Sequence, residues 1–189
     1  MAFPVIARTP GAAPALDAPR CAWANAAMHR AYLSLGSNIE PENHLRAALH
    51  ELRERFGMLA ISPVYRSKAV GLEGPDFLNL AVALDTDLDP LALDAWLHAL
   101  EDRHGRLRGG PRYASRTLDV DLVLFDDLVL DGPGHLKIPR PELREAFVLV
   151  PLADIAPDMR DPISGRALRE LLQAAPATAM EAVEFAVDP

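Results

Sequence analysis

The segment from Arg116 to Asp126, RTLDVDLVLFD, has the pattern of a buried β-strand that also carries two acids. Its apolar residues alternate with others, as in a strand with one buried face: Leu118, Val120, Leu122 and Leu124. Because side chains alternate across a strand, Asp119 and Asp121 are expected to share the opposite face. Such carboxylates lie about 6 Å apart and repel each other by roughly 3 kcal/mol at an effective dielectric constant of about 20. A bound proton, neighbouring arginines or a divalent metal ion could each relieve that repulsion.

The composition favours one globular domain of 189 residues, 50% of them hydrophobic and 24% charged. A net charge of −8 disfavours bulk binding to nucleic acid or to anionic membranes. Cys21 is the single cysteine, which excludes a disulfide framework and a cysteine-rich zinc site. No apolar run approaches the length of a membrane span. We therefore expect a cytoplasmic protein that binds neither nucleic acid nor membranes.

The two ends of the chain differ from its middle. Residues 1–29 are rich in Ala and Pro, lack periodicity and lack the apolar core of a signal peptide. They are expected to be a disordered tail, or to precede a true start at Met28. Residues 31–175 are expected to form one domain, and residues 176–189 a weakly structured tail.

The pattern between the tails predicts strands and helices in a definite order. Strands are expected at 31–35, 59–65, 77–84 and 118–124, and helices at about 41–56 and 90–104. A hairpin-like piece at 127–134, an apolar segment at 147–152 and a helix at 168–172 follow. The order β-α-β-β-α-β with a C-terminal extension predicts an α+β, ferredoxin-like fold, in which an antiparallel sheet carries both helices on one face. The other face is then free for a ligand.

Alternation along the third strand predicts which side chains share that free face. Leu78, Leu80, Val82 and Leu84 form one face, and Phe77, Asn79, Ala81 and Ala83 form the other. Phe77 and Asn79 are therefore expected beside Asp119 and Asp121. An aromatic ring, an amide and two acids together are typical of a binding site.

A loop rich in arginine precedes the strand that carries the acids. Residues 103–116 contain Arg103, Arg106, Arg108, Arg112 and Arg116 but no acid, and Gly109 and Gly110 give the loop flexibility. Guanidinium groups suit polyphosphate, because each presents a planar fork to phosphate oxygens. The alternative is that these arginines only neutralise nearby acids. Arginines beside paired aspartates are the groups that metal-assisted phosphoryl transfer needs.

Other motifs are absent or uninformative. The chain contains no G-x-x-x-x-G-K-[ST] motif, which excludes a P-loop enzyme, and no G-x-G-x-x-G follows a strand. The six histidines do not form a zinc pattern and are expected mostly at the solvated surface. Trp96 falls on the apolar face of its helix and is expected in the core.

Six motifs in order resemble those of one enzyme family, from residue 31 to about residue 172. They are AYLSLGSNIEP, SPVYRS, GPDFLNLAVAL, LEDRHGRLR, RTLDVDLVLFD and IPRPELREAFVLVPLADIAPD. The chain resembles the 6-hydroxymethyl-7,8-dihydropterin pyrophosphokinases. The resemblance implies that the pyrophosphoryl group of ATP is transferred to the pterin hydroxymethyl group in folate biosynthesis. The products would be AMP and the pterin diphosphate.

The resemblance also implies a set of site residues. Two Mg²⁺ ions would be held by Asp119 and Asp121, and the pterin would lie between Phe77 and Phe147. The pterin edge would be read by Asn79, helped by the loop that contains Ser67, Val70 and Gly71. The arginines implied in catalysis are Arg106, Arg108, Arg112 and Arg116. The residues implied in binding ATP are Glu101, Leu122, Ile138, Arg140 and Arg144.

Three departures from the family pattern fall in or near this site. Tyr113-Ala-Ser-Arg116 stands where the family often has Trp-Gly-Pro-Arg. Arg140 stands between two prolines where the family has histidine. Glu145 and Ala146 precede Phe147 where the family has an arginine, so Arg144 is the candidate substitute.

Two alternative hypotheses remain open from the sequence. One is a different Mg²⁺-dependent enzyme that acts on nucleotides, such as a hydrolase. The other is a non-enzymatic ferredoxin-like binding module, because that fold hosts many functions. For the pyrophosphokinase, the expected partners are ATP and 6-hydroxymethyl-7,8-dihydropterin, bound to a monomer or a weak dimer.

Overall fold

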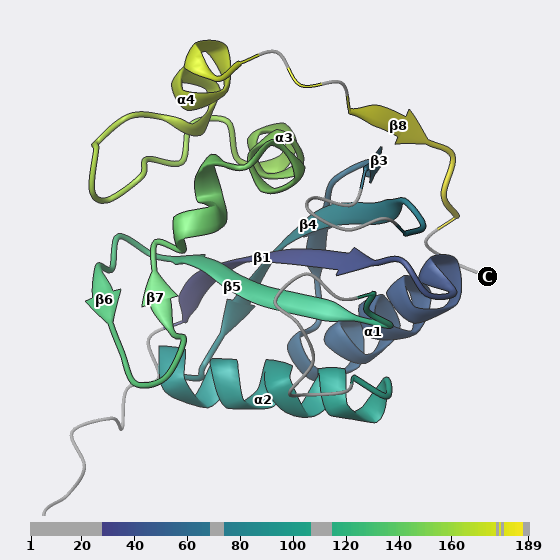
Figure 1. The fold of residues 1–189 in the computed structure, drawn as a ribbon. Helices are drawn as coiled ribbons and strands as arrows, with labels where there is room; N and C mark the ends of the chain where they lie inside the picture. Colours follow the sequence, from purple (N-terminus) through teal and green to yellow (C-terminus); the bar gives the residue numbers. More distant parts are fainter. Residues whose placement is uncertain (1–27, 69–73, 107–114, 177, 179, 187–189) are drawn as a thin grey trace, which may run out of the picture.

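The computed structural model describes residues 28–68, 74–106, 115–176, 178 and 180–186. The chain forms, in order, β1 (His29–Ser37), α1 (Pro41–Phe56), β2 (Leu59–Ile61), β3 (Val64–Ser67), β4 (Phe77–Thr86), α2 (Pro90–Arg103), β5 (Asp119–Phe125), β6 (Leu130–Asp131), β7 (Lys137–Ile138), the 3₁₀ helix η1 (Pro141–Arg144), α3 (Ala146–Ile155), α4 (Leu168–Ala174) and β8 (Glu181–Val183) (Figure 1). No helix among these described residues is both long and apolar enough to cross a membrane.

The main sheet is antiparallel and has the order β5-β1-β4-β3-β8, with β2 also paired to β4. The predicted ferredoxin-like fold is therefore confirmed. The expected second strand is divided, however, into β2 and β3. Pro63 has no N–H for a sheet hydrogen bond, and the hydroxyl of Ser62 accepts the N–H of Ala81 at 2.9 Å instead.

Both long helices cover the same face of the sheet, as predicted (Figure 1). In α1, buried residues recur at helical spacing: Leu45, Ala48, Leu49 and Leu52. Asp89 caps α2 by accepting the N–H of Ala92 at 2.8 Å, and Pro90 occupies the first helical position. The alternating leucines of β4 pack beneath these helices.

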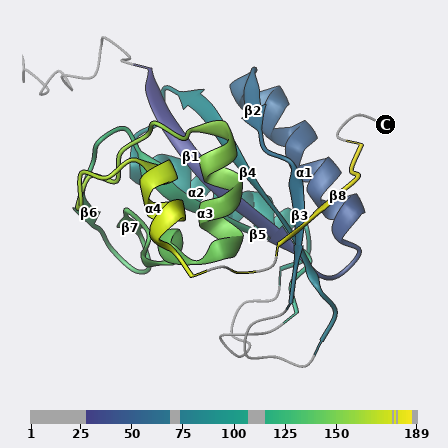
Figure 2. The same ribbon diagram turned by 90° about the horizontal axis from the view of Figure 1, so that it is seen from above.

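The opposite face is only partly free. Figure 2 shows α3 lying over β1 and β4, and α4 packs against α3. A second apolar cluster here includes Ala81, Val148, Leu149 and Leu152. The remainder of that face, toward the start of β5, carries the polar site. Thus the C-terminal extension forms a wall of the site as well as a second core.

One strand prediction is wrong at Leu124. The sequence places Leu124 with Leu122 on the face of the two long helices, but Leu124 and Val123 pack under α3. The pairing of β1 with β5 shifts register between Tyr32 and Leu33, as at a β-bulge, so one extra residue turns the strand over. Asp119 and Asp121 precede this irregularity and keep the alternation that the sequence predicts.

A strand that the pattern does not predict lies within residues 176–189. β8 pairs with β3 and extends the sheet. Beyond it, the backbone carbonyl of Ala186 accepts a hydrogen bond from Arg46 at 2.9 Å, and the Arg46 guanidinium lies 5.2 Å from the ring centre of Phe185. The C-terminal segment therefore connects β3 to α1 and covers an otherwise open sheet edge.

Candidate active site

Gly36 lies at the centre of the site, because β1 runs between β4 and β5. It pairs with Asn79 on one side and with Asp119 on the other. A Cβ atom at Gly36 would come within 3.1 Å of Asn79 Oδ1 and 3.8 Å of the Phe77 ring. Any side chain would fill the space between the amide and the carboxylate. A glycine here thus leaves a floor on which a flat ligand can lie.

Asn79 and Ser67 come together on this floor, as the sequence analysis expects. Asn79 is 4% exposed, and its amide nitrogen donates to the hydroxyl of Ser67 at 2.9 Å. Phe77 begins the same strand on the same face. Phe147 lies near the start of α3, half-buried and packed against the second apolar cluster on this side of the sheet.

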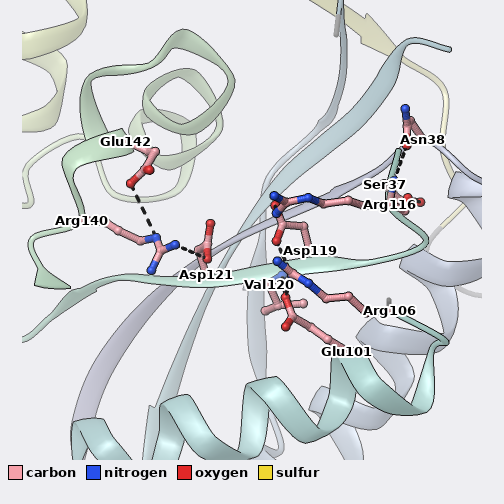
Figure 3. Close-up of polar contacts among 10 residues, drawn as sticks. All are labelled: Ser37, Asn38, Glu101, Arg106, Arg116, Asp119, Val120, Asp121, Arg140 and Glu142. Atoms are coloured by element: carbon pink, nitrogen blue, oxygen red, sulfur yellow. Dashed lines mark hydrogen bonds and ion pairs between the residues drawn. The ribbon is translucent and has the colours of Figure 1, made fainter. Parts of the chain in front are cut away.

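Asp119 is held by two arginines that approach from different segments. Arg106 follows the end of α2, Arg116 precedes β5, and each donates to one carboxylate oxygen (Figure 3). Arg106 also donates to Glu101, a buried residue of α2 with 1% exposure. The Glu101 carboxylate in turn accepts the backbone N–H of Val120 on the edge strand β5 at 2.8 Å. Glu101 therefore joins the helix, the strand edge and the arginine.

Asp121 is held by one arginine, which comes from the C-terminal extension. Nη2 of Arg140 lies 2.8 Å from Asp121 Oδ1 (Figure 3). The backbone N–H of Arg140 donates to Val123 O at 2.9 Å, which fixes the residue beside β5. Its Nε is buried without a hydrogen-bond partner among the described residues, and Glu142 Oε2 is 3.7 Å away. One donor of this guanidinium is thus left without a hydrogen bond, and a ligand could reach it only if the side chain moved.

The repulsion between the two acids is relieved by arginines at Asp119, and by an arginine together with a raised pKa at Asp121. Three carboxylates, of Glu101, Asp119 and Asp121, face the guanidinium groups of Arg106, Arg116 and Arg140. Burial raises the pKa of Asp121 to about 7, and the charge of Asp119 adds to this effect while Arg140 opposes it. Burial opposes the charge of Arg106, but Asp119 and Glu101 outweigh it and raise the pKa of that residue.

Asn38 is a residue of this region that the sequence analysis did not single out. It is 4% exposed, and its amide nitrogen donates to Pro75 O and Ser115 Oγ, each at 3.2 Å. Its carbonyl oxygen accepts the backbone N–H of Arg116 at 2.7 Å. One side chain thus connects the end of β1, the segment before β4 and the segment before β5. An asparagine directly after a predicted strand is the sequence signal that could have indicated this role.

Some of the expected site residues lie elsewhere or are not described. Arg144 pairs with Asp161 at 2.6 Å and has a half-exposed side chain. Leu122 and Ile138 are each 1% exposed, and their side chains pack in the main core. Outside the described residues lie Val70, Gly71, Arg108, Arg112 and Tyr113.

The donor set fits Mg²⁺ when phosphate supplies further ligands. Among the described residues, no three His, Cys, Asp or Glu side chains converge to hold a metal by themselves. Mg²⁺ commonly takes one or two carboxylates together with substrate phosphates and water. Asp119 and Asp121 share one face and remain 24% and 28% exposed, so both carboxylates can reach a bound ion.

Paired carboxylates among arginines, on one face of a ferredoxin-like sheet, are the groups that an enzyme of nucleotide-dependent phosphoryl transfer needs. The chain belongs to the 7,8-dihydro-6-hydroxymethylpterin-pyrophosphokinase (HPPK) family, whose model matches residues 32–157. Its reaction is the transfer of pyrophosphate from ATP to hydroxymethyldihydropterin in folate biosynthesis. This membership decides between the three hypotheses in favour of the pyrophosphokinase.

Relatives with the same enzyme name span nearly the whole domain. The 2-amino-4-hydroxy-6-hydroxymethyldihydropteridine pyrophosphokinase of Pseudomonas aeruginosa is 45% identical over 159 residues, which cover 82% of this chain and 96% of the relative. The enzyme of Synechocystis is 40% identical and covers 80% of this chain and 79% of the relative. Among solved structures, the HPPK-DHPS protein of Plasmodium falciparum with pteroate superposes with a TM-score of 0.63. That match covers 78% of this chain and 42% of the other at 15% identity, so it supports the fold alone.

Proposed function

We propose that the transfer depends on two Mg²⁺ ions held by Asp119 and Asp121, and that the pterin lies on the floor formed by Gly36. The observation that carries this proposal is the row Asn79–Gly36–Asp119 across three paired strands. A flat ligand read by Asn79 at one end of the row would direct its other end toward the carboxylates. The acceptor hydroxyl would then meet the triphosphate beside the metal-binding pair.

The pterin half of the site is formed by β4, β3 and α3. The Asn79 amide, already oriented by Ser67, would bond the polar edge of the pterin. Phe77 and Phe147 would cover the two faces of the ring, which suits an aromatic ligand. Val70 and Gly71 would complete this half with backbone groups, as the family resemblance implies.

The phosphate half is formed by arginines. Bond formation between the pterin oxygen and the β-phosphorus releases AMP, whose departing oxygen gains negative charge. Arg106 and Arg116 would stabilise that charge from positions prepared by Glu101 and Asn38. Bound Mg²⁺ would neutralise charge on the triphosphate. Arg108 and Arg112, which lie outside the described residues, would add donors to the phosphates, as the family resemblance implies. Arg140, from the residue before η1, and Arg144, once it leaves Asp161, would bind ATP.

Product analysis by mass spectrometry tests this proposal. The protein is mixed with ATP, Mg²⁺ and 6-hydroxymethyl-7,8-dihydropterin, and we expect AMP and the pterin diphosphate in equal amounts. The matched control replaces Mg²⁺ with a chelator and should give neither product. ADP in place of AMP would contradict pyrophosphoryl transfer, and ATP consumption without pterin would indicate a hydrolase.

We also propose that the enzyme acts in the cytoplasm as a monomer or weak dimer that binds no nucleic acid. Its net charge of −8 supports the last point, because phosphate backbones repel an acidic protein. Light scattering at several protein concentrations is the measurement that checks the oligomeric state.

A further inference from the structure

Arg140 occupies the carboxylate that the proposed function assigns to a metal ion. The 2.8 Å contact between its Nη2 and Asp121 Oδ1 covers one of the two oxygens that an ion could use. The residue comes from the segment between β7 and η1, and not from the arginine loop that serves Asp119. A guanidinium and a divalent cation repel each other, so close contact of both with Asp121 at once is unfavourable.

The backbone of Arg140 is anchored, and therefore its side chain is the part that can change partners. Its N–H donates to Val123 O at 2.9 Å, and its carbonyl accepts the N–H of Leu143 at 3.0 Å. Prolines stand on both sides of it and restrict the backbone further. The side chain is 19% exposed at the edge of the polar face.

The guanidinium has unused capacity for an anion. Arginine carries five N–H donors in a rigid fork. Nε of Arg140 is buried without a hydrogen bond among the described residues, and Glu142 at 3.7 Å is beyond hydrogen-bond range. Asp121 thus satisfies this group only in part. Because Nε is buried, the side chain would have to turn away from Asp121 before a phosphate oxygen could become the missing acceptor.

We propose that Arg140 is the counter-ion of Asp121 in the nucleotide-free protein and moves to the phosphates of ATP when the nucleotide arrives with its metal. The inference rests on the proposed function, because it assumes that Asp121 is a metal ligand. The consequence is that the affinity for the metal ion depends on whether the nucleotide binds with it. Metal alone must displace Arg140 and binds weakly, whereas metal with nucleotide supplies Arg140 with new acceptors and binds tightly.

Metal and nucleotide affinities, measured separately, test this exchange. Arg140→Gln removes the charge, Arg140→Lys keeps it, and Lys137→Gln removes one charge from an exposed residue of β7 that pairs with Asp131 at 3.4 Å. The first probe is Mn²⁺ without nucleotide, followed by electron paramagnetic resonance. The second is α,β-methylene-ATP with Mg²⁺, followed by calorimetry, since this analogue lacks the bond that breaks.

We expect opposite changes for the two probes. Arg140→Gln should bind Mn²⁺ alone about tenfold more tightly, because a competing charge is gone, and the nucleotide analogue about tenfold more weakly. Arg140→Lys should keep the weak Mn²⁺ binding of the wild type, and Lys137→Gln should change neither affinity.

Two results would overturn the exchange. Unchanged Mn²⁺ affinity in Arg140→Gln would show that Arg140 does not compete for Asp121. Unchanged affinity for the analogue would show that Arg140 does not move to the phosphates. Failure of the proposed function is seen separately, in wild-type protein that binds no Mn²⁺ even with nucleotide and releases no AMP.

Discussion

The two faces of β4 and β5 differ in chemistry although neighbouring residues form them. On the face of α1 and α2, Leu80 and Leu122 are fully buried among other leucines. On the other face, Asn79 and Asp121 adjoin them in sequence and form part of the candidate active site. The strand period of two allows one segment to supply stability and chemistry at once. Substitutions at adjacent residues should therefore separate loss of activity from loss of stability.

Asp119→Ala should give the largest effect on activity. We expect turnover to fall about a thousandfold or more, because a proposed metal ligand and the partner of two arginines are lost together. The free energy of unfolding should fall less than in Leu80→Ala, since Asp119 is partly exposed and water can reach the arginines. Steady-state assays and urea unfolding check both expectations. Asp127→Ala, which removes an exposed acid just after β5, is the control and should keep wild-type turnover.

Leu80→Ala should give the largest effect on stability. Its side chain is 0% exposed, and removing it should lower the free energy of unfolding by about 2–5 kcal/mol. The folded fraction should keep a nearly normal KM for the pterin, because the other face of β4 keeps its residues. Urea unfolding and pterin titration measure the two quantities. A large change in KM at unchanged stability would mean that the two faces are not independent.

Asn38→Ala should give an intermediate loss of both activity and stability, because Asn38 joins the segments that carry both halves of the site. Loss of its three side-chain hydrogen bonds should lower kcat/KM about tenfold and the free energy of unfolding by about 1–3 kcal/mol. Ser115→Ala removes only one of these partners and should reduce kcat/KM by about twofold. Equal effects of the two variants would contradict a joining role for Asn38.

Substitution of His44, a residue of α1, should give the smallest effect, and the quantity affected is the pH dependence of stability. Its Nδ1 lies 3.1 Å from that of His104, whose Nε2 lies 3.0 Å from Glu51, so the two facing nitrogens share one proton. Burial, and then His104, lower the pKa of His44 below 6.5, while Glu40 opposes this. The unfolded chain therefore binds the proton more readily, and this contribution to stability is present above pH 6.5 and lost as the pH falls below it.

Urea unfolding between about pH 5 and 7.5 checks this prediction. His44→Gln should reduce the loss of stability at low pH by less than about 1 kcal/mol. His50→Gln, on the same helix but with a side chain 72% exposed, should follow the wild-type curve. A wild-type protein whose stability rose as the pH fell through this window would contradict the assigned direction.

The sequence predicted most of the sheet because strand alternation and helix periodicity are local. It predicted the shared face of Asp119 and Asp121, and the family resemblance implied that Asn79 and Ser67 lie in one region. It did not predict that Leu124 faces the other side of the sheet, because a register shift depends on the partner strand. The histidines show the same limit, since the side chain of His104 is only 9% exposed rather than solvated.

By itself, the sequence determined the order of the elements, the two acids on one face and, through its motifs, the family. Tertiary structure decided that Gly36 separates Asn79 from Asp119, that Asn38 joins Pro75 to Ser115, and that Arg140 pairs with Asp121. The physical reason is that hydrogen bonds and ion pairs need atoms within about 3 Å. Residues far apart in the chain reach that distance only after packing has set the register of β1 between β4 and β5.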